Sequence, residues 1–315
     1  MRVGRKIKEK NNFFLGILTG ALSVILITIL IPSFIARTQI AGISIFPKPQ
    51  PTPSPDPAKI QALVTKEVLP DKLDLGVSIG DTVIKMIKDG AIDKDKLLQV
   101  YSGQNNSLTT NEKQLLDNPD NGKLTVTPQN ASFILNLLWP LGISNKTAVL
   151  AKGPMGTQYK NDVGNFASTG GWTLGKIPGE ELFNKFNLIQ LTPQQEQEIT
   201  EISQNIYRPC CGNSTYFPDC NHGAAMLGFL ELAVSQEMPK DEIYKKALVL
   251  NSYWFPQTYV ENALYFKTQK GISWDKVDPK VVLGANYSSG TGFAQIDKEL
   301  QSKEIVPKVN SGSSC

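Results

Sequence analysis

The sequence predicts a mainly α protein: an irregular helical extracytoplasmic domain behind a single N-terminal transmembrane helix. Three observations lead to this prediction. An uncharged apolar run follows a basic N-terminus, a proline-rich stretch comes next, and helix start signals recur beyond residue 58. The length of 315 residues and a hydrophobic content of 41% are ordinary for a chain of one or two domains.

The apolar segment 13–36 has the length of a signal anchor. Its 24 residues carry no charge, and as a helix they would span roughly 36 Å, against about 30 Å for a bilayer's hydrocarbon core. A cleaved signal peptide has a shorter apolar region and small residues before the cut. Phe34 does not fit that pattern, and Gly42 and Ser44 offer only a weak cleavage position. We therefore predict that the chain meets a lipid bilayer through residues 13–36.

The basic side chains are concentrated at the N-terminus. Five of them lie in the tail 1–12, and Arg37 alone follows the apolar run. This asymmetry predicts a cytoplasmic N-terminus and a main domain outside the cytoplasm. Residues 1–37 hold six of the 32 basic and one of the 29 acidic side chains, which leaves 26 and 28 in the remainder. A nearly neutral remainder without a basic block argues against nucleic acid as a partner.

The rest of the chain divides by composition. Residues 37–57 carry proline at every second position from 47 to 57, which favours an extended polyproline II stalk, with the eleven residues 47–57 reaching roughly 34 Å. Residues 58–304 form the predicted helical domain, and 305–315 form a flexible tail that ends in Cys315.

Helix signals define the elements of the domain. Thr127 followed by Pro128, and Thr192 followed by Pro193 with Gln195, are typical N-terminal signals. They predict helices within 127–142 and 191–207. Further helices are expected within 80–90, 93–101, 239–255 and 256–271, the last ended by Gly271. The best strand is 122–127, and the stretches 150–178 and 273–293 are expected to be loops.

Three short motifs resemble functional sites but lack necessary parts. Residues 170–176 match GxxxxGK, but Ile177 replaces the Ser or Thr of a phosphate loop. The calcium-like stretch 117–122 has Pro119 in a ligand position. Residues 273–276 have the SxxK spacing without its partner motifs. The aromatic residues between 253 and 266 are interpreted as core packing.

The stretch 208–223 holds three of the four cysteines and the only histidine of the chain. An apolar helix is predicted after it, with Asn221 as N-cap and His222 as the first helical residue. Cys220 would then lie at a helix N-terminus, where a thiolate is stabilised. Met226 shares the helix face of His222. Glu231 lies about 180° away, and it is expected to pair with a basic group or to reach the surface.

Three interpretations of the cysteine stretch remain open. Outside the cytoplasm the cysteines could form disulfide staples of a structural or interaction domain, with Cys315 as a possible partner. A metal site would use Cys210, Cys211, Cys220 and His222, with Met226 as an additional ligand, and would suit Zn or Cu(I). A thiol site would combine a Cys220 thiolate and a nearby protonated His222 with a resolving cysteine, Cys210 or Cys211. The sequence identifies no catalytic residue and no reaction.

Overall fold

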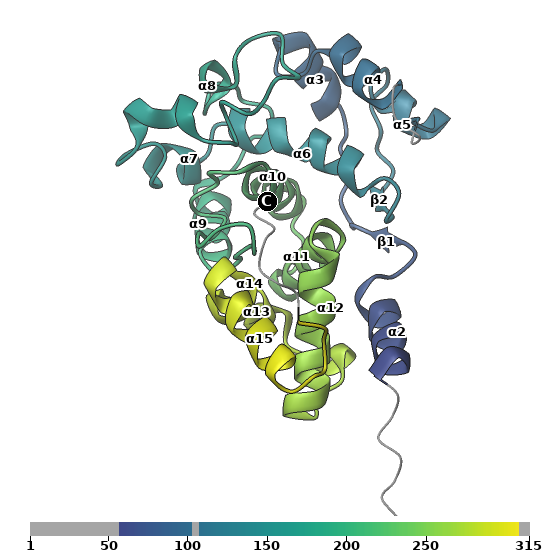
Figure 1. The fold of residues 1–315 in the computed structure, drawn as a ribbon. Coiled ribbons are helices and arrows are strands. Elements are labelled where there is room, and N and C mark those ends of the chain that lie inside the picture. The colour runs from purple at the N-terminus through teal and green to yellow at the C-terminus, as the bar shows by residue number, and fades with distance from the viewer. Residues whose placement is uncertain (1–56, 103–106, 309–315) are drawn as a thin grey trace, which may run out of the picture. The chain divides into compact units, whose positions relative to one another are not determined.

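Helices dominate the part of the chain that the computed structural model describes, residues 57–102 and 107–308 (Figure 1). These residues all belong to the unit Pro55–Cys315. The predicted mainly α class is therefore confirmed for them. No helix within these ranges is long and apolar enough to cross a membrane. The predicted anchor at 13–36 lies outside the described residues, as do the basic tail, nearly all of the stalk and Cys315.

The elements follow one another closely along the chain. The first group comprises α2 (Pro57–Val68), β1 (Leu73–Asp74), α3 (Thr82–Asp89), α4 (Lys94–Ser102), α5 (Thr110–Gln114), β2 (Thr125–Val126), α6 (Ala131–Ser144), α7 (Ala148–Lys152) and α8 (Gly179–Leu182). The second group comprises α9 (Pro193–Ser203), α10 (Asn221–Ser235), α11 (Lys240–Trp254), α12 (Pro256–Tyr265), α13 (Pro279–Val282), α14 (Ala285–Ser288) and α15 (Gly290–Ser302).

Helices α6 and α10 form the centre of the core, where α10 lies directly against α6 (Figure 1). Both sequences are apolar on nearly every side, as buried helices are, and every residue of α10 from Gly223 to Val234 is buried. Two glycines allow the backbones to touch. A Cβ on Gly142 would lie 1.8 Å from the carbonyl oxygen of Ala224, and one on Gly228 would lie 2.3 Å from that of Leu138. Any side chain at either position would push the two helices apart.

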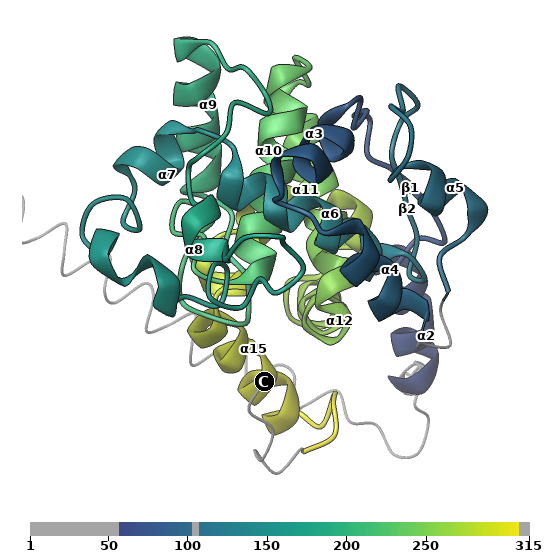
Figure 2. The same ribbon diagram turned by 90° about the horizontal axis from the view of Figure 1, so that it is seen from above.

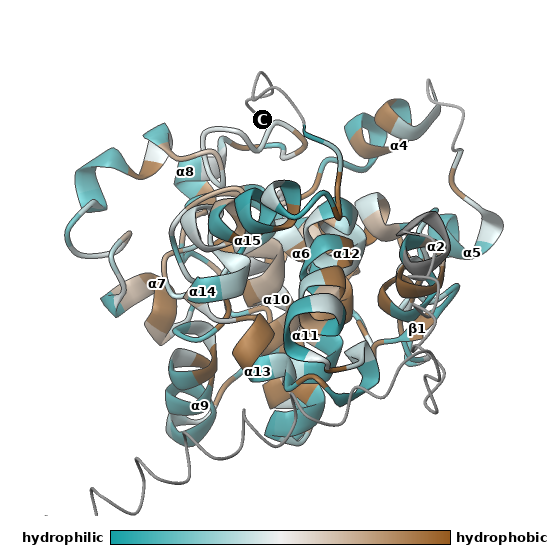
Figure 3. Ribbon diagram, turned by 60° about the horizontal axis from the view of Figure 1, so that its bottom comes forward, coloured by the Kyte–Doolittle hydropathy of each residue, from teal (hydrophilic) through white to brown (hydrophobic). Residues whose placement is uncertain are grey.

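The outer helices are amphipathic, and hydrophilic residues cover much of α9 and α15 (Figure 3). The predicted start of α9 is confirmed in detail. The side chain of Thr192 accepts a hydrogen bond from the backbone N–H of Gln195, and the Gln195 side chain accepts one from the N–H of Thr192. This reciprocal capping box satisfies two backbone donors that would otherwise be unpaired.

The predicted start of the first core helix was three residues too early. Residues 127–130 form a turn in which the N–H of Thr127 donates to Asn130 Oδ1 at 2.8 Å, and α6 begins at Ala131. The local hydrogen bonds of Thr127 and Asn130 compete with the helix for the same backbone groups. The short strand predicted at 122–127 is confirmed as β2, which pairs antiparallel with β1.

The C-terminal region is more helical than its composition suggested. Residues 273–293, expected to be a loop, contain a 3₁₀ turn (Trp274–Lys276), α13, α14 and the start of α15. Asp278 caps α13 through the N–H of Lys280, and Ser289 caps α15 through that of Gly292. Helix α12 continues into a π turn at Phe266–Lys270, which ends as predicted at Gly271 with φ +67°.

The glycine-rich stretch 170–176 has a structural role, as its incomplete motif indicated. Trp172 is buried and donates from Nε1 to the carbonyl oxygen of Ala91 at 2.8 Å. Its ring packs edge-on against Trp139, with centroids 4.9 Å apart. The calcium-like stretch is likewise a turn, in which Asp120 Oδ1 accepts from the N–H of Gly122.

Candidate metal centre

The three clustered cysteines lie in the connection between α9 and α10. Figure 2 shows these two helices from above. A bridge between Tyr207 and Ser214 folds this connection back on itself. The N–H of Thr215 donates to Ile206 at 2.8 Å, and the N–H of Tyr207 donates to Leu283 at 2.8 Å. These backbone bonds hold both ends of the loop, so that Cys210 and Cys211 come back to the start of α10.

The sulfur atoms of Cys210, Cys211 and Cys220 all lie within 4.8 Å of one another. The Sγ atoms of Cys210 and Cys220 are 3.5 Å apart, and all three residues are free, half-buried cysteines. A tetrahedral ion with metal–sulfur bonds of about 2.3 Å holds its sulfur ligands about 3.8 Å apart. The separation of the thiols therefore fits a metal site. Within the described ranges this is the one group of His, Cys, Asp or Glu side chains that is arranged in this way.

Cys220, and not Asn221, is the N-cap of α10. Its sulfur accepts a hydrogen bond from the N–H of Gly223 at 3.4 Å. Asn221 is instead the first residue of the helix, and its Oδ1 accepts from the adjacent N–H of His222. The predicted N-cap was thus one residue too late. Cys220 therefore lies at the N-terminal end of α10, where the helix dipole favours negative charge.

Arg208 is the central residue of the site, although sequence analysis did not select it. Its side chain is 1% exposed, and its Nε donates to Cys220 Sγ at 2.9 Å. The guanidinium also donates to the carbonyl oxygens of Asn213 at 3.1 Å and Phe217 at 2.9 Å, and it forms an ion pair with Asp219. All of its nitrogen atoms therefore have partners, as a buried guanidinium requires.

A sequence signal for Arg208 does exist. The chain has only four arginines, and Arg208 is the only one after Arg37; every other basic residue in that part is lysine. A lysine offers a single point charge, whereas the planar guanidinium can serve several fixed acceptors at once. One arginine placed two residues before the first clustered cysteine is therefore a usable indication of a buried charge centre.

The three thiols differ in acidity. Hydrogen bonds from Cys210 and Cys211 lower the pKa of Cys220 most, and the neighbouring His222 and Arg208 lower it further, although burial alone would raise it. Contacts with Cys211 and Cys220, followed by burial, raise the pKa of Cys210. Cys220 is thus the thiol of the three that ionises most readily, and the Sγ of Cys210 lies 3.5 Å from its sulfur.

His222 lies outside the group of three sulfurs, and its role as a fourth ligand stays a prediction. Its ring packs on Phe255, with centroids 4.4 Å apart, and lies 5.9 Å from the ring of Trp254. Met226 is buried in the apolar core with 1% exposure, and its role as an additional ligand stays a prediction. The aromatic residues predicted to pack in the core do so: Tyr253, Tyr259 and Phe266 are buried, and Trp254, Phe255 and Tyr265 pack against them.

A buried polar network holds the cysteine loop in place. Asn251 Nδ2 donates to the carbonyl oxygen of Tyr207 at 3.1 Å and to Tyr259 Oη at 3.0 Å, and Tyr259 Oη lies 2.8 Å from Ser288 Oγ. The N–H of Gly290 donates to the carbonyl oxygen of Cys211 at 2.9 Å. Helices α11, α12 and α14 and the start of α15 therefore all contribute to positioning the cysteine loop.

Glu231 neither pairs with a basic group nor reaches the surface, which were the two predicted environments. It is fully buried in the middle of α10, and neither carboxylate oxygen has a hydrogen-bond partner in the structure. Burial raises its pKa well above the usual value, opposed by the nearby Asn145. The prediction of a basic partner or a surface position was wrong because α10 is enclosed on every side, including the face opposite His222.

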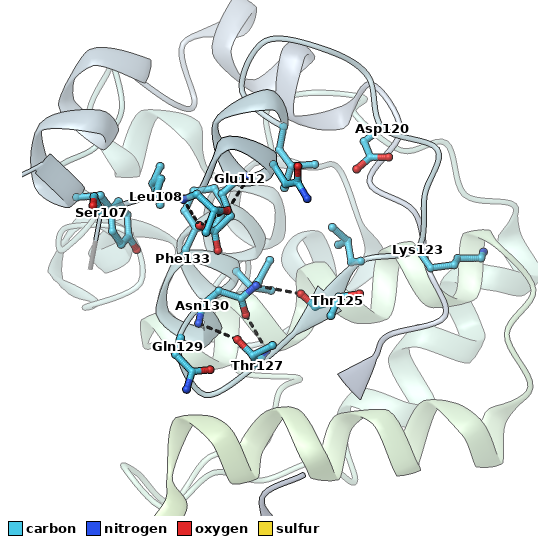
Figure 4. A pocket seen from close by; sticks show the side chains of 16 residues that line it. Ser107, Leu108, Glu112, Asp120, Lys123, Thr125, Thr127, Gln129, Asn130 and Phe133 are labelled. Carbon is cyan, nitrogen blue, oxygen red and sulfur yellow. Dashed lines mark hydrogen bonds between the residues drawn. The ribbon is translucent and has the colours of Figure 1, made fainter. Parts of the chain in front are cut away.

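A pocket of about 550 Å³ lies elsewhere, between α5, β2 and the start of α6 (Figure 4). Its polar groups bond to one another. Thr109 and Glu112 form a capping box, and Asn130 bonds with Thr127 and with the carbonyl oxygen of Thr125. Because these groups are already paired, the pocket presents no buried polar group in need of a ligand.

No protein-family model matches the chain, and no similar curated protein or solved structure was found. Three thiols that converge around one stabilised sulfur form a cluster that could hold a metal ion or act as a thiol site.

Proposed function

We propose that the helical domain binds a soft metal ion through the sulfur atoms of Cys210, Cys211 and Cys220. The single observation that carries this proposal is the convergence of three free thiols within 4.8 Å of one another. Thiolates are the ligands that select Zn and Cu(I) over hard cations. A disulfide would use two of the three sulfurs and leave the position of the third unexplained. Coordination of a metal ion uses all three.

The surroundings of Cys220 support the same proposal. An ion cannot bind a thiol without displacing its proton, and Cys220 is held close to the ionised state by Arg208 and the N-terminus of α10. Binding could begin at this sulfur and then displace the protons of Cys210 and Cys211. We propose Zn or Cu(I) as the bound ion, consistent with the softness of sulfur ligands.

Native mass spectrometry of the full-length chain in a mild detergent tests this function. The wild type should take up one equivalent of added Zn(II) or Cu(I), with loss of protons and no disulfide. Cys211→Ser should lower the affinity by more than the 10–100-fold typical of residues that only support a ligand. His222→Ala is the matched control and should still bind one equivalent. A wild-type chain that binds neither ion, with its thiols reduced, would contradict the proposal.

A dithiol redox site is the second candidate, favoured by the 3.5 Å between the sulfurs of Cys210 and Cys220. The Cys220 thiolate would attack a small-molecule or protein disulfide, releasing one donor thiol and forming a mixed disulfide. Cys210 would then attack the Cys220 sulfur, releasing the second donor thiol and leaving a Cys210–Cys220 disulfide. With oxidised glutathione, Cys210→Ser should stop at the mixed disulfide, whereas Cys211→Ser should complete the reaction.

The alternative of a disulfide staple predicts that the Cys210–Cys220 disulfide is permanent. In that case the chain purified without reductant would already contain it, and reduction would lower the free energy of unfolding. A metal-free mass that is short by two hydrogen atoms per disulfide bond would favour this structural function over the metal site.

We propose further that residues 13–36 anchor the domain in a bilayer with the N-terminus in the cytoplasm. Support comes from the 24 uncharged residues and from the basic tail before them. Membrane fractions washed with alkaline carbonate should retain the full-length chain and release a variant that lacks residues 13–36. Release of the full-length chain as well would contradict the anchor without touching the metal proposal.

A further inference from the structure

We propose that Arg208 sets the charge preference of the thiol cluster, so that the cluster favours a monovalent soft cation over a divalent one. This inference rests on the proposed metal-binding function and narrows it, since it predicts that the site favours Cu(I) over Zn(II). It assigns Arg208 as a specificity-determining residue that acts through Cys220 rather than as a ligand.

The positive charge of Arg208 is permanent. The guanidinium is buried among four acceptors and has no route to lose its proton at physiological pH. Any ion that binds the Cys220 sulfur must therefore come to rest close to a fixed positive charge.

Apart from the neighbouring thiols of Cys210 and Cys211, the Cys220 sulfur faces positive groups. It accepts from Arg208 Nε at 2.9 Å and from the N–H of Gly223 at 3.4 Å, at the positive end of the α10 dipole. Hydrogen bonds to a coordinating sulfur reduce the charge that it offers to an ion. A divalent ion, which gains more from negative charge on its ligands, loses more from this arrangement than a monovalent ion does.

Asp219 compensates for Arg208 only in part, because the two charges face different sulfurs. The Asp219 carboxylate Oδ1 lies 3.9 Å from Cys211 Sγ, whereas Arg208 donates directly to Cys220. The ion pair therefore acts as a dipole across the cluster, with its positive end at the most acidic thiol. At an effective dielectric constant of about 20, one extra unit of charge near such a cation changes affinity by about 10–100-fold after partial compensation.

Ag(I) and Cd(II) provide a matched pair of probes, since both are soft closed-shell ions that differ in charge. The ratio of their affinities is measured by competition on the full-length chain in detergent, with native mass spectrometry as the readout. Within one variant, a general loosening of the loop weakens both ions and cancels in the ratio. The wild type should prefer Ag(I), and Arg208→Gln should shift the ratio toward Cd(II) by about 10–100-fold.

Two further variants separate charge from shape. Arg208→Lys keeps the charge and should keep the wild-type ratio within about threefold, even where absolute affinities fall. Asp219→Asn removes the compensating charge and should shift the ratio toward Ag(I). This variant also tests the inference if Arg208→Gln does not fold.

The outcomes are distinguishable. A ratio that is unchanged in both Arg208→Gln and Asp219→Asn, with both ions still bound, would overturn the role of Arg208 and leave the metal site intact. A wild type that prefers Cd(II) would overturn the charge preference in the same way. Failure of the wild type to bind either ion would overturn the metal site and this inference together.

Discussion

Two ionisable groups of helix α10 lie in opposite circumstances, Cys220 at its N-cap and Glu231 in its middle. The Cys220 sulfur meets a guanidinium, a backbone N–H and two thiols. The Glu231 carboxyl is fully buried and has no hydrogen-bond partner in the structure. The same helix thus lowers the pKa of one group through its neighbours and raises that of the other through burial.

The comparison shows that a buried titratable group is not by itself a site. Desolvation without a partner makes a group neutral and inert, whereas desolvation with opposite charges makes it ionised and reactive. Cys220 meets the second condition because Arg208 was placed beside it. Glu231 meets the first because burial, together with the charge of Glu196, raises its pKa more than the amide of Asn145 lowers it.

The largest effect should come from removing the charge beside Cys220. Arg208→Met would remove the charged partner of Asp219 and the donor to the carbonyl oxygens of Asn213 and Phe217. Breaking a buried ion pair in this way costs about 3–5 kcal/mol of stability. Urea denaturation measures the change.

Lys240→Met is the matched control for Arg208→Met, since it breaks the exposed pair of Lys240 with Glu201. That pair should contribute about 1 kcal/mol or less. Equal losses in the two variants would mean that Arg208 is not the charge centre of the loop.

Glu231→Gln should produce a pH-dependent gain in stability. The folded state raises the pKa of Glu231 above its usual 4.5, so the folded protein holds a proton that the unfolded chain releases. Wild-type stability is therefore greatest below the unfolded pKa and falls as pH rises through the window between the two values, by up to about 1.4 kcal/mol per pH unit. Urea midpoints between about pH 4 and 8 should show Glu231→Gln gaining on the wild type as pH rises.

Glu181→Gln, on the exposed side of α8, is the control for that series and should follow the wild type at every pH. A constant difference between Glu231→Gln and wild type across the range would show that Glu231 does not titrate differently in the two states.

Gly223→Ala should disturb the charged end of α10 without removing any polar group. A Cβ at this position would lie 2.6 Å from Arg208 Cζ, and the partners of Arg208 leave it no room to move. Overpacking of this kind costs about 1–3 kcal/mol, measurable by thermal unfolding. Gly212→Ala, where no atom lies within 4 Å of the new Cβ, should change stability by about 0.5 kcal/mol at most.

Cys220→Ser should have the smallest effect on stability and a large one on reactivity. Serine is a good N-cap, so the loss should be about 1 kcal/mol or less. Because the pKa of Cys220 is lowered, its thiolate should be the fastest to react with iodoacetamide near pH 6. That fast phase should disappear in Cys220→Ser and persist in Cys211→Ser. A fast phase that follows Cys211 instead would reverse the assignment.

Local signals predicted the helices well where a single mechanism fixed their ends. The capping box of Thr192 and Gln195 and the stop at Gly271 are examples. Prediction failed where two local arrangements compete, as at Thr127 and Asn130, and where short capped helices lie in a glycine-rich and polar stretch, as between 273 and 293.

The candidate site was predicted in part. The spacing of Cys210, Cys211 and Cys220 around a helix start was enough to predict that their thiols converge. The direction of the His222 ring depends on Trp254 and Phe255, which lie more than 30 residues away and could not be placed from the local sequence. The ion pair of Arg208 likewise depends on how the loop closes, and only the rarity of arginine in the chain indicated it.

The glycine contact between α6 and α10 has a mechanical consequence for the thiol cluster. Because Gly142 and Gly228 bring the backbones of α6 and α10 into direct contact, α10 is held rigidly, and Cys220 at its N-terminal end is held with it. Residues 209–219 have no helix of their own, so adjustment to the radius of a guest ion falls to Cys210 and Cys211. Ion binding should therefore move the loop and not the helix. It should slow amide hydrogen exchange in the loop and leave exchange in α10 unchanged.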